Sequence, residues 1–298
     1  MKNNIQFNRF YKVFNFISLA LVIISVLLIF FKGLNFGVDF KGGTLIELRV
    51  NDKQTNISSL RSAFNSMNLG DVAIKNFGNE NDYLIKFEKK DKDKNLIQNI
   101  KKDLTKKIGP VYEFRRVENV GPKVSAELLN KGLIAIAVAL GAMLFYIWIR
   151  FEWQFSIGAI IALFHDVIIT IGIFSLFSIE INLSIVAAVL TIVGYSMNDT
   201  VVIYDRIREN LSKFSKISIG EISNISINET LSRTLITSAT TLLALLSIFI
   251  LGGEILRGFA FAMILGVLIG TYSSIFVASP ILKYLNVSYK TIDKENKN

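Results

Sequence analysis

The amino-acid sequence predicts an α-helical polytopic membrane protein with six transmembrane helices and one α+β domain outside the membrane. Of its 298 residues, 51% are hydrophobic, and the mean hydropathy of +0.46 is far above that of soluble domains. The apolar residues are gathered into blocks of about 17 to 24, long enough to cross a bilayer as helices. Residues 32–131, in contrast, are polar, with 19 Lys and Arg against 13 Asp and Glu.

The first apolar block, residues 14–31, predicts the first transmembrane helix. Residues 1–13 before it carry Lys2, Arg9 and Lys12 and no acid. The block is longer than the core of a secretory signal peptide, and no small-residue cleavage site follows it. We therefore expect an uncleaved signal anchor with a cytoplasmic N-terminus.

Residues 32–131 change period repeatedly, as expected of a mixed α+β domain. The pattern predicts strands at 44–50, 72–77, 83–87 and 111–117, a helix at 57–69 with Asn56 as N-cap, and a helix at 94–108 that ends before Gly109 and Pro110. This β-α-β-β-α-β order predicts a ferredoxin-like domain. Its lysine-rich face, within residues 86–107, is interpreted as solvated surface and not as a nucleic-acid site, because no aromatic or arginine residues are interleaved.

The remaining apolar blocks predict five more transmembrane helices, at residues 132–149, 155–177, 183–204, 234–251 and 258–282. Residues 205–233 are expected to form a charged loop, and residues 283–298 a polar tail. Trp148 and Trp153 are expected to anchor the turn between the second and third helices at the interface. Thirteen Lys and Arg residues lie on the side of the termini, against Arg257 alone in the opposite short loops. The termini are therefore predicted to be cytoplasmic, and residues 32–131 periplasmic.

The fourth predicted helix contains a carboxylate, Asp199, that needs an explanation. Thr191, Tyr195 and Asp199 recur every four residues with Asn198 beside them, which predicts a polar stripe on an apolar helix. A carboxylate near mid-membrane costs roughly 2.5 to 3.5 kcal/mol, so it normally faces protein or water and often marks a proton or ion path. The alternative is a structural residue that holds helices together by hydrogen bonds.

Other polar residues in the membrane blocks are weaker candidates. His165 and Asp166, in the third helix, could relay protons or could form an interhelical hydrogen-bonding pair. Arg233, at the cytoplasmic end of the fifth helix, could pair with Asp199 as a protonation switch or could be a topology anchor. The fifth helix is also rich in hydroxyl groups, which suit helix packing or a water-lined path: Ser232, Thr234, Thr237, Ser238, Thr240 and Thr241. Gly266-x-x-x-Gly270 in the sixth helix predicts close helix packing.

Several classes of site are disfavoured by composition. The absence of cysteine excludes disulfides and thiolate sites, and a single histidine excludes a multi-histidine metal site. Asp166 and Asp199 raise the alternative of an intramembrane aspartyl protease, but the Gly-x-Gly-Asp half of that signature is missing and Asp205 is expected at the membrane surface. The glycine-rich residues 36–44 lack the ending of a phosphate loop. We expect no cofactor, no metal and no nucleic acid.

Four motifs together resemble the SecF family, the smaller membrane partner of SecD in bacterial protein export: FGVDFKGGT (36–44), ENVGPKVSAEL (118–128), RFEWQFSIGAIIALFHDVIIT (150–170) and GYSMNDTVVIYDRIREN (194–210). The resemblance covers about residues 10–285. It implies half of a resistance-nodulation-division type of transporter, completed by SecD in the inner membrane. It also implies that Asp199 and Arg233 take part in proton passage, whereas it assigns no firm role to His165 and Asp166.

The resemblance implies a function without covalent chemistry. With SecD, such a protein uses the proton motive force to promote the late, ATP-independent stage of preprotein translocation through SecYEG, with YajC and YidC as further candidate partners. Two alternatives stay open, namely a proton-driven exporter of small amphiphiles and a passive scaffold of the translocon. A single outer domain of about 90 residues disfavours the exporter, because such pumps use paired porter subdomains.

Overall fold

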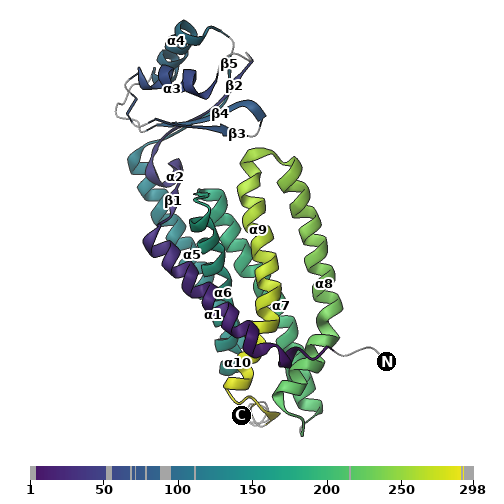
Figure 1. The fold of residues 1–298 in the computed structure, drawn as a ribbon. Coiled ribbons are helices and arrows are strands. Elements are labelled where there is room, and N and C mark those ends of the chain that lie inside the picture. Colours follow the sequence, from purple (N-terminus) through teal and green to yellow (C-terminus); the bar gives the residue numbers. More distant parts are fainter. Residues whose placement is uncertain are drawn as a thin grey trace. The chain divides into compact units, whose positions relative to one another are not determined.

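The computed structural model describes residues 5–51, 56–67, 69–70, 72–77, 79–87, 95–110, 112–214, 216–289 and 291 (Figure 1). The chain divides into a helical unit, residues 1–35 and 134–298, and an α+β unit, residues 36–133. Parts of the predicted N-terminus (1–4), of the lysine-rich segment (88–94) and of the tail (290 and 292–298) lie outside the described residues.

Within the described residues, six helices are long and apolar enough to cross a membrane, so the predicted fold class is confirmed. The first five are α1 (Tyr11–Phe31), α5 (Pro122–Arg150), α6 (Trp153–Leu176), α7 (Leu183–Lys213) and α8 (Ile219–Leu251). The sixth consists of α9 (Gly253–Ser273), a π-helical turn η2 (Ser274–Ala278) and α10 (Ser279–Tyr284). A short 3-10 helix, η1 (Phe7–Arg9), precedes α1. Two short strands, β1 (Asn35–Phe36) and β6 (Glu180–Ile181), pair with each other.

The helices α6, α7 and the sixth span form the centre of the helical unit. Within their most apolar windows, 56%, 50% and 56% of the residues are buried, against 11%, 6% and 17% for α1, α5 and α8. Figure 1 shows α8 and α9 running side by side, and α8 also contacts α7. The three outer helices therefore present most of their apolar surface to the surroundings.

Close contact between α7 and α9 depends on two glycines. A Cβ atom added to Gly266 would lie 2.2 Å from Cγ1 of Ile192, and one added to Gly270 would lie 2.9 Å from Cβ of Ser196. Any side chain at Gly266 would thus occupy space that α7 already fills. The prediction that Gly266-x-x-x-Gly270 is a close-packing contact is confirmed.

Two predicted boundaries are wrong. Residues 205–233, predicted as a loop, are mostly helical, because α7 continues to Lys213 and α8 begins at Ile219. The two extensions are joined by polar contacts, with Arg206 Nε 2.7 Å from Glu229 Oε2 and Asn210 Nδ2 2.9 Å from Ser226 Oγ. The second spanning helix likewise begins at Pro122, ten residues before the predicted start at 132. Hydropathy did not predict these continuations because their residues are polar.

The α+β unit has the predicted β-α-β-β-α-β order, preceded by a one-turn helix α2 (Val38–Lys41). Its elements are β2 (Gly43–Val50), α3 (Ile57–Asn65), β3 (Val72–Phe77), β4 (Asn79–Phe87), α4 (Leu96–Ile108) and β5 (Tyr112–Val120). The strands are ordered β3-β4-β2-β5, and each neighbouring pair is antiparallel. Residues of α3 and α4, such as Leu60 and Leu104, share a core with Ile46 and Ile85 of the sheet. Asn56 caps α3 as predicted, accepting a bond from Ser59 N at 3.0 Å.

The other face of the sheet carries several charged side chains. Arg49 makes two bonds of 2.7 Å to the buried carboxylate of Asp82. Burial lowers the pKa of Lys86 on β4 to about 8, and the positive charges of Lys75 and Lys41 act in the same direction. Below about pH 8, Lys86 is therefore protonated in the folded unit, and its partly buried charge lowers the free energy of unfolding.

We expect Gly266→Ala to lower the free energy of unfolding by about 1 to 3 kcal/mol, because the new methyl group forces α9 away from α7. Thermal unfolding in detergent would measure the change. The matched control is Gly141→Ala on α5, where an added Cβ meets nothing within 4 Å. Equal unfolding temperatures for the two variants would contradict the close contact.

We expect Lys86→Met to stabilise the α+β unit at neutral pH, with a gain that shrinks as the pH rises from about 8 to 10.5. In that window the unfolded chain binds more protons than the folded one, so the stability of the wild type rises with pH through Lys86. Hydrogen exchange of the β4 amides in the full chain would measure the difference. A gain that is constant with pH, or equal to that of Lys102→Met on exposed α4, would contradict the assignment.

Candidate functional site

The carboxylate of Asp166 is the most completely enclosed charged group of the helical unit, with no solvent exposure. Its Oδ1 lies 2.8 Å from Nδ1 of His165, the preceding residue on α6. Its Oδ2 accepts hydroxyl bonds from Ser273 of α9, at 2.7 Å, and from Ser196 of α7. One carboxylate thus joins α6, α7 and α9.

His165 extends this cluster towards α1. Its ring stacks on Tyr272 with a centroid distance of 6.1 Å, and the Tyr272 hydroxyl donates to the Phe14 carbonyl at 3.0 Å and lies 2.7 Å from Ser18 Oγ. Among the described residues, the buried Nε2 of His165 has no hydrogen-bond partner. The structure therefore brings His165 and Asp166 together as an interhelical cluster.

Asp199 lies in a second, separate cluster. Its side chain is 3% exposed, and its Oδ2 accepts a bond of 3.3 Å from the Thr271 hydroxyl of α9. The Thr271 hydroxyl in turn lies 2.7 Å from Oγ of Ser238 on α8. Because Asp166 and Asp199 bind different hydroxyls and share no hydrogen bond in the described part of the chain, they do not form the paired carboxylates of an aspartyl protease.

Arg233 is exposed on α8 and makes no ion pair with Asp199 within 4.0 Å in the described ranges. It lies within electrostatic range of that carboxylate. The direct contact considered in the sequence analysis is therefore not formed in this conformation. Thr234, the next residue, is buried.

The predicted polar stripe of α7 divides into two sets. Asp199 faces the interior, and the half-buried Tyr195 has a buried hydroxyl without a partner among the described groups. Thr191 and Asn198 are exposed, and the Thr191 hydroxyl donates to the Ala187 carbonyl of its own helix at 2.8 Å. The stripe thus reaches the outer surface of α7 as well as the interior.

Sequence reasoning missed the hydroxyl donors to the two carboxylates. Ser196 lies inside the fourth-helix motif, but no sequence pattern distinguishes it as a donor. A usable pattern exists in the sixth span, where Thr271, Ser273 and Ser274 form a short polar run in an apolar helix. Ser274 Oγ lies 2.9 Å from Thr200 Oγ1, and the π-helical turn η2 begins at Ser274. Such turns are frequent at functional sites.

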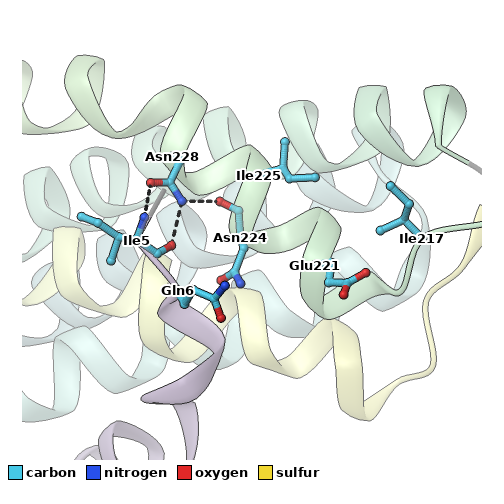
Figure 2. Close-up of a pocket in the computed structure, with 7 residues that line it drawn as sticks. All are labelled: Ile5, Gln6, Ile217, Glu221, Asn224, Ile225 and Asn228. Carbon is cyan, nitrogen blue, oxygen red and sulfur yellow. Dashed lines mark hydrogen bonds between the residues drawn. The ribbon is translucent and has the colours of Figure 1, made fainter. Parts of the chain in front are cut away.

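A separate pocket of about 240 Å³ lies between the N-terminal segment and the start of α8 (Figure 2). Its lining residues are Ile5, Gln6, Ile217, Glu221, Asn224, Ile225 and Asn228. Asn228 bonds both backbone groups of Ile5, through Oδ1 to the amide at 3.0 Å and through Nδ2 to the carbonyl at 2.9 Å. None of the residues predicted to couple protons lines this pocket. The two bonds of Asn228 hold the N-terminal segment against α8.

The enclosed titratable groups of the helical unit include Asp166, Asp199 and His165. No group of three or more His, Cys, Asp or Glu residues that could hold a metal ion occurs within the described part of the chain. Two carboxylates, one imidazole and several hydroxyls can each accept or donate a proton inside an apolar helix bundle.

Comparisons with known proteins agree on one family. Residues 100–288 match the family model described as "Protein export membrane protein SecD/SecF, C-terminal", and residues 27–53 match the "SecD/SecF GG Motif". Relatives named "Protein translocase subunit SecF" are 46% identical in Rickettsia bellii and 47% identical in Calditerrivibrio nitroreducens; each alignment covers 94% of this chain and 93% of the relative.

Solved structures give the same result. The crystal structure of SecDF from Thermus thermophilus, described as a translocon-associated membrane protein, matches with a TM-score of 0.84 at 34% identity over 95% of this chain. A SecDF structure in a super-membrane-facing form matches with a TM-score of 0.70 at 33% identity. The chain spans 39% and 40% of the length of these two SecDF chains. With its spanning helices, its motifs and these relatives, the chain belongs to the SecF family of protein translocase subunits.

Proposed function

We propose that this chain, together with a SecD-like partner, uses proton flow across the inner membrane to promote the late, ATP-independent stage of preprotein translocation. Asp199 is the residue that exchanges the proton. The observation that carries this proposal is a buried carboxylate in a helical membrane unit, for which Thr271 is the one hydroxyl donor among the described residues. No covalent chemistry on the preprotein is involved.

Asp199 suits proton exchange better than Asp166 because it is less completely coordinated. Asp166 is bound by His165, Ser196 and Ser273, from three helices, and is fully enclosed. Asp199 has one donor, at 3.3 Å, and its Oδ1 has no hydrogen-bond partner among the described residues. Protonation of Asp199 therefore affects one described hydrogen bond to the carboxylate, whereas protonation of Asp166 would disturb three.

The exposed face of α7 supports a helical partner in the membrane. Ala187, Thr191, Gly194 and Asn198 recur at spacings of three and four residues, and all four are exposed. Small and polar residues in this pattern are typical of transmembrane helix contacts. The side-chain amide of Asn198 has no hydrogen-bond partner in the described part of the chain, which is unfavourable in lipid. A SecD-like chain would cover this face, as suggested by the SecDF structures in which the matching region is 39% of a longer chain.

The energetics are sufficient for such coupling. Each proton that crosses a potential of 100 mV releases about 2.3 kcal/mol. Two protons therefore approach the roughly 5.5 kcal/mol that moves a two-state equilibrium from 1:99 to 99:1. Arg233, exposed near the same carboxylate, would approach or leave Asp199 as the acid changes charge.

We further propose the arrangement of the assembly. Both termini are cytoplasmic, the α+β unit is periplasmic and contacts emerging preprotein, and SecYEG is the channel, with YajC and YidC as further partners. The Lys and Arg distribution supports this orientation. A passive scaffold would differ in one respect, because its contribution to export would not respond when the membrane potential is dissipated.

We expect Asp199→Asn to abolish proton flux and export by proteoliposomes that contain the partner chain, because the amide cannot take up a proton. Arg233→Met should lower both activities by about tenfold. This factor corresponds to the loss of one charge interaction with Asp199 that is worth roughly 1.4 kcal/mol. Proton flux would be followed with an internal pH indicator, and export with a labelled preprotein.

Asp205→Asn is the matched control, because Asp205 is half-exposed and pairs with Arg150 at 2.7 Å outside both clusters. Its flux should equal that of the wild type. Normal flux and export in Asp199→Asn would refute the coupling role, and export that is unaffected by dissipating the potential would favour the scaffold.

We expect Asp166→Ala to lower the free energy of unfolding by about 2 to 4 kcal/mol, because three buried donors lose their acceptor. Asp205→Ala should cost less than about 1 kcal/mol, as is typical of exposed ion pairs. Chemical unfolding in detergent would measure both. A stable Asp166→Ala variant that has lost proton flux would instead make His165 and Asp166 proton carriers.

A further inference from the structure

We propose that Ser238 and Thr271 form a hydroxyl relay that carries protons from Asp199 to the α8 side of the helical unit. This inference rests on the proposed role of Asp199 and adds two residues and an exit path to it. It is carried by the positions of buried hydroxyl groups on α7, α8 and α9.

The hydroxyl-rich stretch of α8 contains two kinds of side chain. Thr237, Thr240 and Thr241 donate to carbonyls of their own helix and are half-buried or exposed, so they satisfy themselves locally. Ser238 is 6% exposed and Thr234 is 2% exposed. Of this stretch, Ser238 is the residue with a described hydrogen bond to another helix, through Thr271. The structure thus singles out one face of α8.

The directions of the bonds follow from the number of protons. Each hydroxyl group has one proton to donate, and an ionised carboxylate only accepts. Thr271 donates its proton to Asp199 Oδ2, so in the bond of 2.7 Å between Ser238 and Thr271 the donor must be Ser238. The order from Ser238 through Thr271 to Asp199 is therefore continuous and has one direction.

Two unpartnered hydroxyls extend the relay at its ends. Thr234 Oγ1 lies one turn before Ser238 on α8, directly after Arg233, and it is buried without a partner among the described residues. Tyr195 OH lies one turn before Asp199 on α7 and is also buried and unpartnered within that set. Buried polar atoms of this kind are normally bonded to ordered water. Water at Thr234 would connect Ser238 with the exposed Arg233.

The proton balance is simple. Asp199, as a carboxylic acid, gives its proton from Oδ2 to the oxygen of Thr271, Thr271 passes its own proton to Ser238, and Ser238 passes its own to a water molecule at Thr234. A hydronium ion leaves, both hydroxyls are neutral before and after, and the carboxylic acid becomes a carboxylate. The order after this transfer is the one described above, with Ser238 donating to Thr271 and Thr271 donating to Asp199, and rotation of the two hydroxyl groups prepares the next transfer.

The test uses the full chain with its SecD-like partner in proteoliposomes, with proton flux driven by an imposed potential. Thr271→Val, which keeps the shape of the side chain, and Ser238→Ala should each lower the flux by about tenfold or more, the effect of losing a hydrogen bond to a charged group. Thr271→Ser, which restores only the hydroxyl, should return most of the flux. A purely structural role of Thr271 in packing would not be rescued in this way.

Two controls remove a hydroxyl elsewhere on α8. Thr240→Val and Ser247→Ala should leave the flux unchanged, because these exposed hydroxyls bond carbonyls of their own helix at 2.9 Å. If Asp199→Asn abolishes flux while Thr271→Val and Ser238→Ala conduct normally, the relay is wrong and the proposed function stands. If Asp199→Asn itself conducts, the proposed function fails. Loss in Thr271→Val without recovery in Thr271→Ser would also overturn the relay.

Discussion

The carboxylate of Asp166 is the polar contact on which the arrangement of the central helices depends. It accepts bonds from His165 of α6, Ser196 of α7 and Ser273 of α9, in a place that solvent does not reach. In an apolar bundle each of these donors would be costly without an acceptor, so the three helices can satisfy them together only in one relative position. Gly266 and Gly270 make that position possible, because they let α9 approach α7.

This fixed centre gives Asp199 its separate environment. Thr271 and Ser273 are two residues apart on α9, so their side chains leave the helix about 200° apart and serve different carboxylates. Ser273 donates to the enclosed acid, and Thr271 donates to Asp199, whose Oδ1 has no hydrogen-bond partner among the described residues. The same short run of α9 thus serves two carboxylates in different environments, while Arg233 on α8 is exposed.

Hydropathy was enough to predict the six spanning helices, and period changes were enough to predict the order of the α+β unit, because both depend on patterns spread over many residues. The extent of α7 and α8 was not predicted, since residues 205–233 are charged. A usable signal was present, because Ser218 followed by Glu221 is a capping pattern, and Ser218 Oγ accepts the Glu221 amide at 3.3 Å. Asp199 stood out as a charge in an apolar block, whereas the partners Ser273 and Thr271 are defined only by tertiary packing.

The π-helical turn explains how the sixth span serves two layers of polar contacts. At its first residue and just before it, Thr271, Ser273 and Ser274 reach Asp199, Asp166 and Thr200. At its last residue, the Ala278 carbonyl accepts the hydroxyl of the fully buried Tyr204 at 3.0 Å. A π-turn adds one residue to a helix, so everything beyond it is rotated by about 100° relative to a regular α-helix. The turn thus links the hydroxyl groups that bind the carboxylates of α6 and α7 to the contact with Tyr204.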